Sequence, residues 1–253
     1  MSSVTQLHDI VFVICYWSST IWRFNATTHQ QLADINVAGL RHPHMIAACE
    51  QTSQVFVADR VECVWRVSAD GAHIIRLLPK SPLEVFKPWT LSMTSTRLLV
   101  TSREPKQLMQ FDADGDELRR VQLPRSMEPH HAVESPAAGT FIISHSITKQ
   151  NQHQISEVNA DGEVLRQFTG SGLPSLVLPP RVAVDSRGHI FVTDAHNCAV
   201  WLLNAQLKLR RVIIDEHQLN YKQPRRICYI ERSGQLLVGL EDSVAVFGVL
   251  CRR

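Results

Sequence analysis

An internal repeat runs through this 253-residue chain and limits its fold more than any other feature. Five times an apolar residue is followed by a small polar residue and then by alanine, and the polar residues are Asn25, Ser68, Asp112, Asn159 and Asn204. Successive copies are 43, 44, 47 and 45 residues apart. A period of this size is typical of chains that stack one supersecondary unit many times.

Turn and strand signals recur with the same period. Three copies continue into an Asp-Gly pair that lies between alternating apolar segments, and these pairs begin at Asp70, Asp114 and Asp161. Such a pair is typical of a β-hairpin because glycine accepts the positive φ of the turn. At the other end of each unit a proline precedes a short apolar strand, a position where the missing N–H is tolerated. These prolines are Pro43, Pro88, Pro129, Pro180 and Pro224.

Each unit therefore contains four short strands, and six units of about 42 residues fill the chain. We predict an all-β fold, a six-bladed β-propeller in a single domain. An open β-solenoid is the alternative, but its parallel strands need no hairpin turns. The boundaries are placed near Gly39, Lys80, Pro124, Gly172 and Glu216. The blades then cover approximately residues 1–39, 40–80, 81–124, 125–172, 173–216 and 217–253.

The ends of the chain bear on how the propeller closes. The last unit stops after its third strand, around residues 243–247. The N-terminal residues 1–6 can complete the first blade or the last, but not both. We therefore expect one three-stranded blade, or a chain that is a fragment of a longer protein.

Composition narrows the function classes. With 44% hydrophobic and 20% charged residues the chain is neither disordered nor rich enough in apolar residues for a membrane span. Its net charge of +2 gives no strong basic field for nucleic acid. The longest N-terminal apolar run, residues 10–15, is far shorter than a spanning helix. The six cysteines form no CxxC pair, which favours reduced thiols in the cytoplasm and argues against zinc fingers.

Residues 180–200 carry a family resemblance. They read Pro180, an apolar strand ending in Asp185, then Gly188, a second apolar strand ending in Asp194, and finally Asn197 and Val200. This segment resembles an NHL repeat, and the second unit keeps part of the pattern while the others are degenerate. The resemblance implies a six-bladed propeller that serves as a protein- or RNA-binding platform, like the C-terminal domains of tripartite-motif ubiquitin ligases. No RING or B-box cysteine pattern is present, so ligase activity is not implied.

Candidate catalytic groups have simpler structural interpretations. Asp59 and Asp194 directly follow a strand, where we expect them to accept backbone N–H bonds rather than to bind metal. Several histidines fall in loops, but none has a metal-binding spacing such as HExxH, and we expect them to be exposed loop residues. Neither a Gly-rich phosphate loop nor a G-x-S-x-G elbow occurs. We expect no cofactor, and a metal-dependent hydrolase or lactonase is the least favoured function.

The residue after each repeat proline is the candidate for binding, because the scaffold repeats while this position varies. In a propeller these residues would ring the mouth of the central channel. They are His44, Trp89, His130, Arg181 and Arg225, supported by Arg226, Tyr221 and Lys222. Neighbouring loops add further cations and aromatics, namely Tyr16, Trp17, Arg60, Arg103, Lys106 and Lys149, but also acidic residues such as Glu62 and Glu84. A solvated face without a ligand, in which the arginines pair with Glu216 or Glu128, remains the alternative.

This mixed face predicts a non-catalytic platform that binds a partner protein. Single-stranded RNA is the second candidate partner, because cations with interspersed aromatics suit phosphate contact and base stacking. Neither a membrane nor a small-molecule cofactor is expected as a partner.

Overall fold

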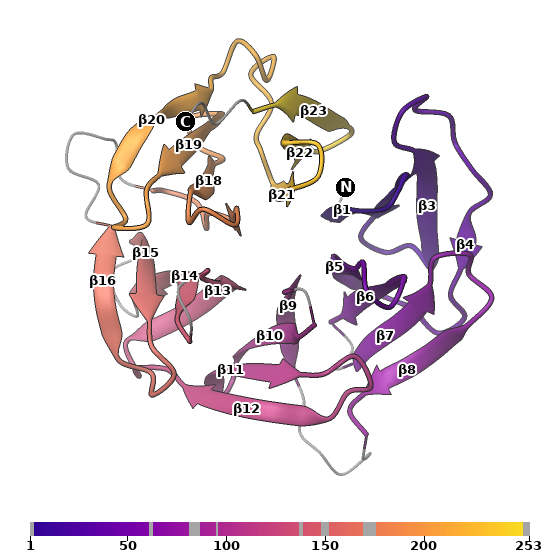
Figure 1. Cartoon of the computed structure of the whole chain (residues 1–253), viewed down its shortest axis with the longest axis horizontal. Helices are drawn as coiled ribbons and strands as arrows, with labels where there is room; N and C mark the ends of the chain where they lie inside the picture. Colours follow the sequence, from indigo (N-terminus) through magenta and orange to yellow (C-terminus); the bar gives the residue numbers. More distant parts are fainter. Residues whose placement is uncertain are drawn as a thin grey trace. The chain divides into compact units, whose positions relative to one another are not determined.

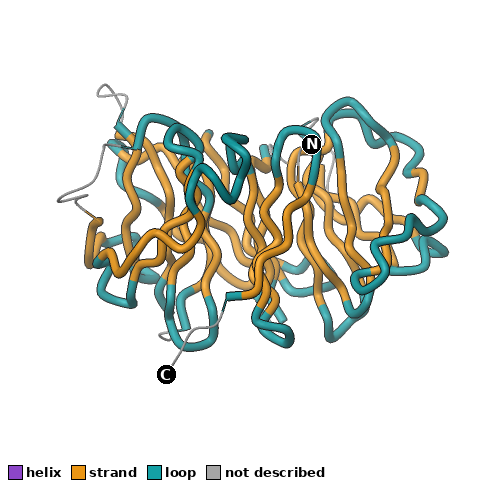
Figure 2. Tube along the Cα trace, turned by 90° about the horizontal axis from the view of Figure 1, so that it is seen from above, coloured by secondary structure: helices purple, strands orange, loops and turns teal. Residues whose placement is uncertain are grey.

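The fold was obtained as a computed structural model, which describes residues 3–60, 63–80, 87–94, 96–136, 139–147, 152–168 and 176–249. In these residues all regular structure is β-strand, as Figure 2 shows, and no helix long and apolar enough to cross a membrane is found among them. Six antiparallel sheets follow one another along the chain (Figure 1). The predicted fold class, an all-β six-bladed propeller, is confirmed.

The chain divides into two compact units, Met1–Arg120 and Val121–Arg253. The strands of the first unit form three four-stranded sheets. The first sheet holds β1 (Ser3–Leu7), β2 (Ile10–Ile14), β3 (Thr20–Asn25) and β4 (Ile35–Asn36), and the second holds β5 (Pro43–Cys49), β6 (Gln54–Asp59), β7 (Cys63–Ser68) and β8 (Ile74–Leu78). The third sheet holds β9 (Pro88–Met93), β10 (Leu98–Arg103), β11 (Lys106–Phe111) and β12 (Glu117–Gln122), and β12 runs across the division between the units.

The second unit holds two four-stranded sheets and one sheet for which the described residues supply three strands. These are β13 (Met127–Glu134), β14 (Phe141–Ile147), β15 (His153–Val158) and β16 (Val164–Phe168); β17 (Val182–Val184), β18 (Ile190–Asp194), β19 (Ala199–Leu203) and β20 (Leu209–Ile214); and β21 (Arg226–Ile230), β22 (Gln235–Gly239) and β23 (Val244–Gly248). Strand β1 pairs with β2, so the N-terminal segment belongs to the first sheet and the last sheet has the three strands.

The predicted blade boundaries can be compared with these sheets. Gly39, Lys80, Pro124 and Glu216 lie between the last strand of one sheet and the first strand of the next. Gly172 lies outside the described residues.

The hairpin turns follow the sequence pattern. Gly71, Gly115 and Gly162 have φ values of 80°, 81° and 85°, in the left-handed region that an L side chain rarely adopts. Each glycine N–H bonds to the carbonyl three residues earlier, on the polar residue that opens the repeat. In two of these turns the carboxylate or amide oxygen of that residue, Asp112 or Asn159, also accepts two backbone N–H bonds. The polar residue and the glycine together close each hairpin.

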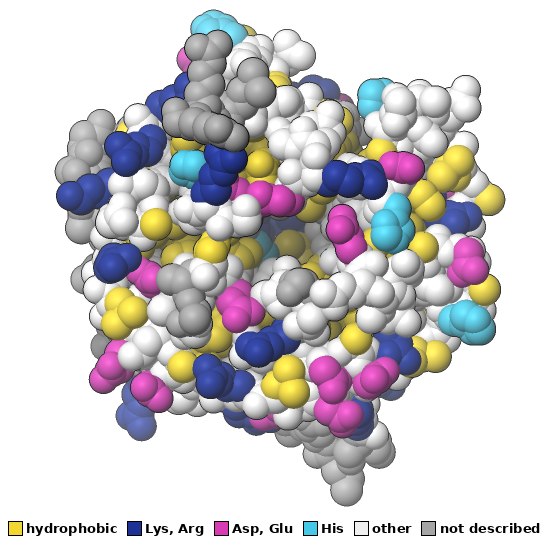
Figure 3. All heavy atoms as spheres, in the orientation of Figure 1, with side chains coloured by type: hydrophobic (Ala, Val, Ile, Leu, Met, Phe, Trp, Pro, Cys, Tyr) yellow, Lys and Arg dark blue, Asp and Glu magenta, His cyan; other side chains and the backbone are white. Residues whose placement is uncertain are grey.

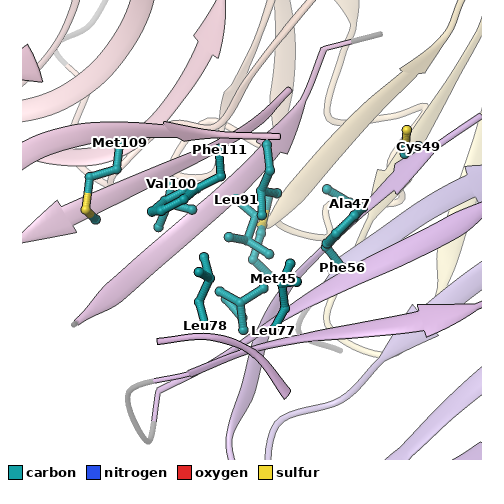
Figure 4. Packing of buried hydrophobic residues seen from close by; sticks show 13 residues of the cluster. Met45, Ala47, Cys49, Phe56, Leu77, Leu78, Leu91, Val100, Met109 and Phe111 are labelled. Atoms are coloured by element: carbon teal, nitrogen blue, oxygen red, sulfur yellow. The ribbon is translucent and has the colours of Figure 1, made fainter. Parts of the chain in front are cut away.

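The core lies between successive sheets within each unit. Phe12, Phe56 and Phe191 occupy the same register position in the second strand of their sheets, and each is 0% exposed. Burying a side chain of this size contributes about 2 to 3 kcal/mol. Figure 4 shows the cluster between the second and third sheets, where Phe56 lies among residues from both sheets. The fourth strands are largely exposed, since β12 and β16 each bury one residue.

Candidate functional site

An arginine–aromatic patch lies where three sheets of the first unit meet at one end of their strands. It consists of residues at or just after the ends of the second strands and at or just before the starts of the first strands: Tyr16, Trp17, His42, His44, Arg60, Trp89 and Arg103. The indole of Trp89 is its centre. The guanidinium carbons of Arg60 and Arg103 each lie 4.4 Å from the Trp89 ring centroid, and the His44 ring lies 5.0 Å from it. These are cation–π distances.

The first sheet contributes two aromatic residues to the patch. Tyr16 accepts a hydrogen bond from Arg60 Nη1 at 3.1 Å and lies edge-on to Trp17, with ring centroids 4.8 Å apart. Trp17 also contacts His42 edge-on at 4.1 Å. Its side chain is 71% exposed, and its backbone has φ 69°. A bulky residue in the left-handed region destabilises the folded state by about 1 kcal/mol or more. The turn therefore exposes a large apolar ring and also adopts an unfavourable backbone conformation.

The positively charged side chains of Arg60 and Arg103 both lie over the Trp89 ring. Burial lowers the pKa of the Arg103 guanidinium, the nearby positive charge of Arg60 lowers it further, and Glu104 opposes both effects. Arginine remains charged at neutral pH despite such a shift. The patch therefore holds two positive charges against one indole ring, a combination that attracts carboxylates and π-systems.

In the second unit His130 and Arg181 lie together but are buried. Arg181 is 6% exposed and donates from Nη1 to the His130 carbonyl at 2.6 Å. The neighbouring His131 accepts the Val182 N–H at its Nδ1, at 3.3 Å. These bonds join β13 to the start of β17, so the Arg181 guanidinium holds two sheets together.

Several histidines differ from the exposed loop residues that we expected. His130, His131 and His145 are 5%, 2% and 2% exposed, because β13 and β14 extend further than the repeat prolines suggested and include these residues. His145 Nε2 lies 2.8 Å from Ser156 Oγ. Burial lowers the pKa of His145 to about 4 and also lowers the pKa of His153, whose ring lies 5.2 Å from that of His130. His145 is therefore neutral at physiological pH.

The loop before β21 carries the remaining predicted contact residues. Tyr221 is 66% exposed with φ 59°, and its hydroxyl lies 2.8 Å from His217 Nδ1. Lys222 forms an ion pair with Asp242 at 2.9 Å. Arg225 is exposed, and Arg226 donates to the Arg225 carbonyl at 2.7 Å. His44 and Trp89 belong to the first unit and the other six predicted residues to the second, so the ring of residues around a channel stays a prediction.

The aspartates that end two second strands accept backbone N–H bonds, as predicted. Asp59 is 0% exposed, and its carboxylate accepts the backbone N–H groups of Arg41 and His42 at 2.9 and 3.0 Å. Asp194 accepts the N–H groups of His196 and Asn197, both at 3.1 Å. These bonds tie each second strand to an adjoining loop.

No group of three His, Cys, Asp or Glu side chains that could hold a metal ion is found in the described part of the chain. Burial and the charge of Asp59 raise the pKa of the Cys63 thiol to about 11, which keeps this sulfur protonated.

The patch was missed as a unit by sequence reasoning, although its members were noted singly. Arg60 and Arg103 each follow the residue at the repeat position of Asp59 and Ser102, so they share one repeat position. That shared register was the available signal. Glu62, Glu84 and Lys149, which we assigned to the same loops, lie outside the described residues.

Comparisons with known proteins establish the fold. No protein-family model matches the chain, and no curated protein matches its sequence. Among solved structures it is similar to hydrazine synthase of Kuenenia stuttgartiensis, with a TM-score of 0.66 and 12% identity over 99% of this chain and 96% of that chain. It is also similar to a protein of unknown function from Bacteroides caccae, with a TM-score of 0.65 and 13% identity over 90% of this chain and 81% of that one. At such identities the likeness concerns the propeller fold alone.

Proposed function

We propose that the chain is a non-catalytic platform that binds a partner protein through the loop face of its blades. The observation that carries the proposal is the stack of Arg60, Trp89 and Arg103, with the exposed ring of Trp17 nearby. Tryptophan and arginine are the side chains most enriched at the energetic centres of protein interfaces. A guanidinium stacked on indole is held in place beforehand, so less side-chain entropy is lost on binding.

The proposal extends to the predicted contact residues outside the patch. Tyr221 and Arg225 are exposed and able to meet a partner directly, whereas Arg181 is buried and acts by holding β13 to the start of β17. The complete set is His44, Trp89, His130, Arg181, Arg225, Arg226, Tyr221 and Lys222.

Single-stranded RNA is the second candidate, favoured by the exposed ring of Trp17, since bases stack on such rings. It ranks lower because cationic and acidic side chains are interspersed on the face drawn in Figure 3, and the net charge is only +2. Binding led by phosphate contacts needs a more uniformly positive surface.

A charge-reversal pair tests the proposal. Arg60→Glu with Arg103→Glu reverses the patch, while Arg119→Glu with Arg210→Glu makes the same charge change at exposed positions of β12 and β20. Partners captured by cross-linking and mass spectrometry should be lost from the first variant and kept by the second. Equal capture by both folded variants would place the binding surface elsewhere.

Salt dependence separates protein from RNA. Binding of a single-stranded RNA pool, measured at about 50 and about 200 mM salt, should weaken by orders of magnitude if several phosphates are contacted. A protein partner anchored on Trp89 should be far less sensitive to the same change. Saturable RNA binding that Arg60→Glu with Arg103→Glu abolishes would favour the second candidate.

We also propose that the sheets are NHL-type repeats and that the protein is cytoplasmic. The first is supported by the Asp194–Asn197 pair, where Asn197 Nδ2 donates to Asp194 Oδ2 at 2.6 Å within the segment that resembles the repeat. The second is supported by the described cysteines, which are all free. Neither a cofactor nor a membrane is part of the proposal.

A further inference from the structure

Arg60 is exposed and carries a positive charge that no carboxylate of the described residues pairs with. Its guanidinium donates from Nη1 to the Tyr16 hydroxyl at 3.1 Å, and its carbon lies 5.9 Å from the Tyr16 ring centroid and 4.4 Å from that of Trp89. All of these partners are neutral. The adjacent Asp59 is 0% exposed and uses both carboxylate oxygens to accept backbone N–H groups.

The contacts with Tyr16 and Trp89 fix how the Arg60 guanidinium is presented. A guanidinium has five N–H groups in one plane, and the Tyr16 hydroxyl accepts one of them. Because the hydrogen bond and the stacked indole hold that plane, the remaining N–H groups are ordered before anything binds. A planar pair of such donors matches the two oxygens of a carboxylate through two parallel bonds.

The charges around Arg60 favour a single carboxylate over a chain of phosphates. Burial lowers the pKa of the Arg103 guanidinium, and the charge of Arg60 lowers it further, so the two cations repel each other. One anion bound at Arg60 relieves this repulsion. Glu104 is exposed, and its charge acts on Arg103 in the opposite sense. A polyanion would bring several negative charges close to Glu104, which disfavours it.

Trp17 gives the same site an apolar half. Tyr16 links the two halves, because its ring lies 4.8 Å from the Trp17 ring while its hydroxyl binds Arg60. The His42 ring also packs edge-on against Trp17 at 4.1 Å, yet Trp17 is 71% exposed. A held but exposed aromatic ring covers an apolar side chain with little loss of entropy. Since an extended chain advances about 3.3 Å per residue, residues two or three positions apart reach both Arg60 and Trp17.

We infer that the partner segment bound at the arginine–aromatic patch carries an acidic residue for Arg60 and, two or three positions away, an aromatic or large apolar residue for Trp17. This inference rests on the proposed function, because it names the chemistry of the partner at that same site. The carboxylate accepts two N–H bonds from Arg60, and Arg103 adds a second attractive charge. The apolar residue covers the Trp17 ring.

A random peptide library displayed on phage is the probe. It is selected on the wild-type protein and counter-selected on Arg60→Glu with Arg103→Glu. The selected peptides should share an aspartate or glutamate and an aromatic or large apolar residue at this spacing. Fluorescence polarisation then measures the affinity of a selected synthetic peptide. Replacing its acidic residue by the matching amide should weaken binding to the wild type about tenfold, as expected when a charge-assisted bond is lost.

Variants of the protein assign each half of the motif to its residue. In Arg60→Gln the same acid-to-amide change should alter affinity by about threefold at most, because the partner charge is gone. The control Arg119→Gln, at an exposed position of β12, should keep the full effect. Trp17→Ala should likewise remove most of the effect of replacing the apolar residue of the peptide by alanine.

The outcomes separate this inference from the proposed function. Selected peptides that need Arg60 and Arg103 but share no acidic residue overturn the inference and leave the proposed function standing. An acid-to-amide effect that persists in folded Arg60→Gln does the same. A library that yields no patch-dependent peptide overturns both. Binding of a single-stranded RNA pool that requires Arg60, with no peptide selected, assigns the patch to RNA and also overturns both.

Discussion

Acidification should destabilise this protein through a histidine that the fold buries in its neutral form. His145 is 2% exposed, hydrogen-bonded to Ser156, and near His153 and the Ser146 carbonyl. Burial lowers the pKa of His145 from 6.5 to about 4, the neighbouring His153 lowers it further, and the Ser146 carbonyl acts in the opposite direction. The unfolded chain therefore binds a proton at His145 between about pH 6.5 and pH 4, while the folded chain does not.

The size of the effect follows from this difference. Because the unfolded state holds more protons in this window, the free energy of unfolding falls as pH falls below about 6.5 and continues to fall until about pH 4. Each pKa unit corresponds to about 1.4 kcal/mol, so the full loss is about 3 kcal/mol, and about 2 kcal/mol is lost by pH 5. Above pH 6.5 the contribution of His145 is constant.

Urea denaturation at pH 7.5, 6 and 5 measures the effect, with His145→Gln as the matched variant. Glutamine can still hydrogen-bond Ser156 but does not titrate, and the carboxylates are the same in both proteins. We expect wild type to lose about 2 kcal/mol more than His145→Gln between pH 7.5 and 5. Parallel pH dependences for the two proteins would refute the reasoning, as would an NMR titration in which His145 protonates near pH 6.5.

Two further substitutions test the scaffold. Asp59→Ala should lower the free energy of unfolding by about 2 to 4 kcal/mol, measured by urea denaturation, because two backbone N–H groups lose a buried acceptor. Asp59→Asn should lower it less. A loss near zero for Asp59→Ala would contradict the structural role of this carboxylate. Gly162→Ala would place a Cβ 2.1 Å from the Gln122 carbonyl oxygen, whereas Gly139→Ala meets nothing within 4 Å, and both residues have positive φ. We therefore expect about 1 kcal/mol for Gly139→Ala, from backbone strain alone, and a clearly larger loss for Gly162→Ala; similar melting temperatures would show that the contact at Gln122 relaxes freely.

The fold was predictable because its signals are local. An alternation of two marks a strand, an Asp-Gly pair marks a tight turn, and a proline marks where a strand begins, whatever the rest of the chain does. Asp194 was predictable for the same reason, since it bonds to the backbone two residues on. Asp59 bonds to the backbone of Arg41, 18 residues earlier, so its role followed from its place in the repeat. The exposure of the histidines was not predictable, because His130 and His145 lie where strands extend past their sequence markers, and burial there depends on neighbouring sheets.

The candidate site was predictable in part. The residue after the repeat proline directed attention to His44 and Trp89, which do lie together. The same reasoning selected Arg181, which is buried against the carbonyl of His130. One repeat position thus contributes His44 and Trp89 to the arginine–aromatic patch in two blades and a buried packing residue, Arg181, in another. Nothing within a single repeat distinguishes these cases.

The sequence by itself determined the number of repeated units, the order of strands within them, the turn residues and the buried triplets, because each depends on interactions between residues close together in the chain. The tertiary structure decided which side chains from different blades meet. Arg60, Trp89 and Arg103 come from two sheets and contact one another only because those sheets pack side by side. The structure likewise decided that β1 joins the first sheet by pairing with β2, since the sequence allowed the N-terminal segment to complete either the first blade or the last.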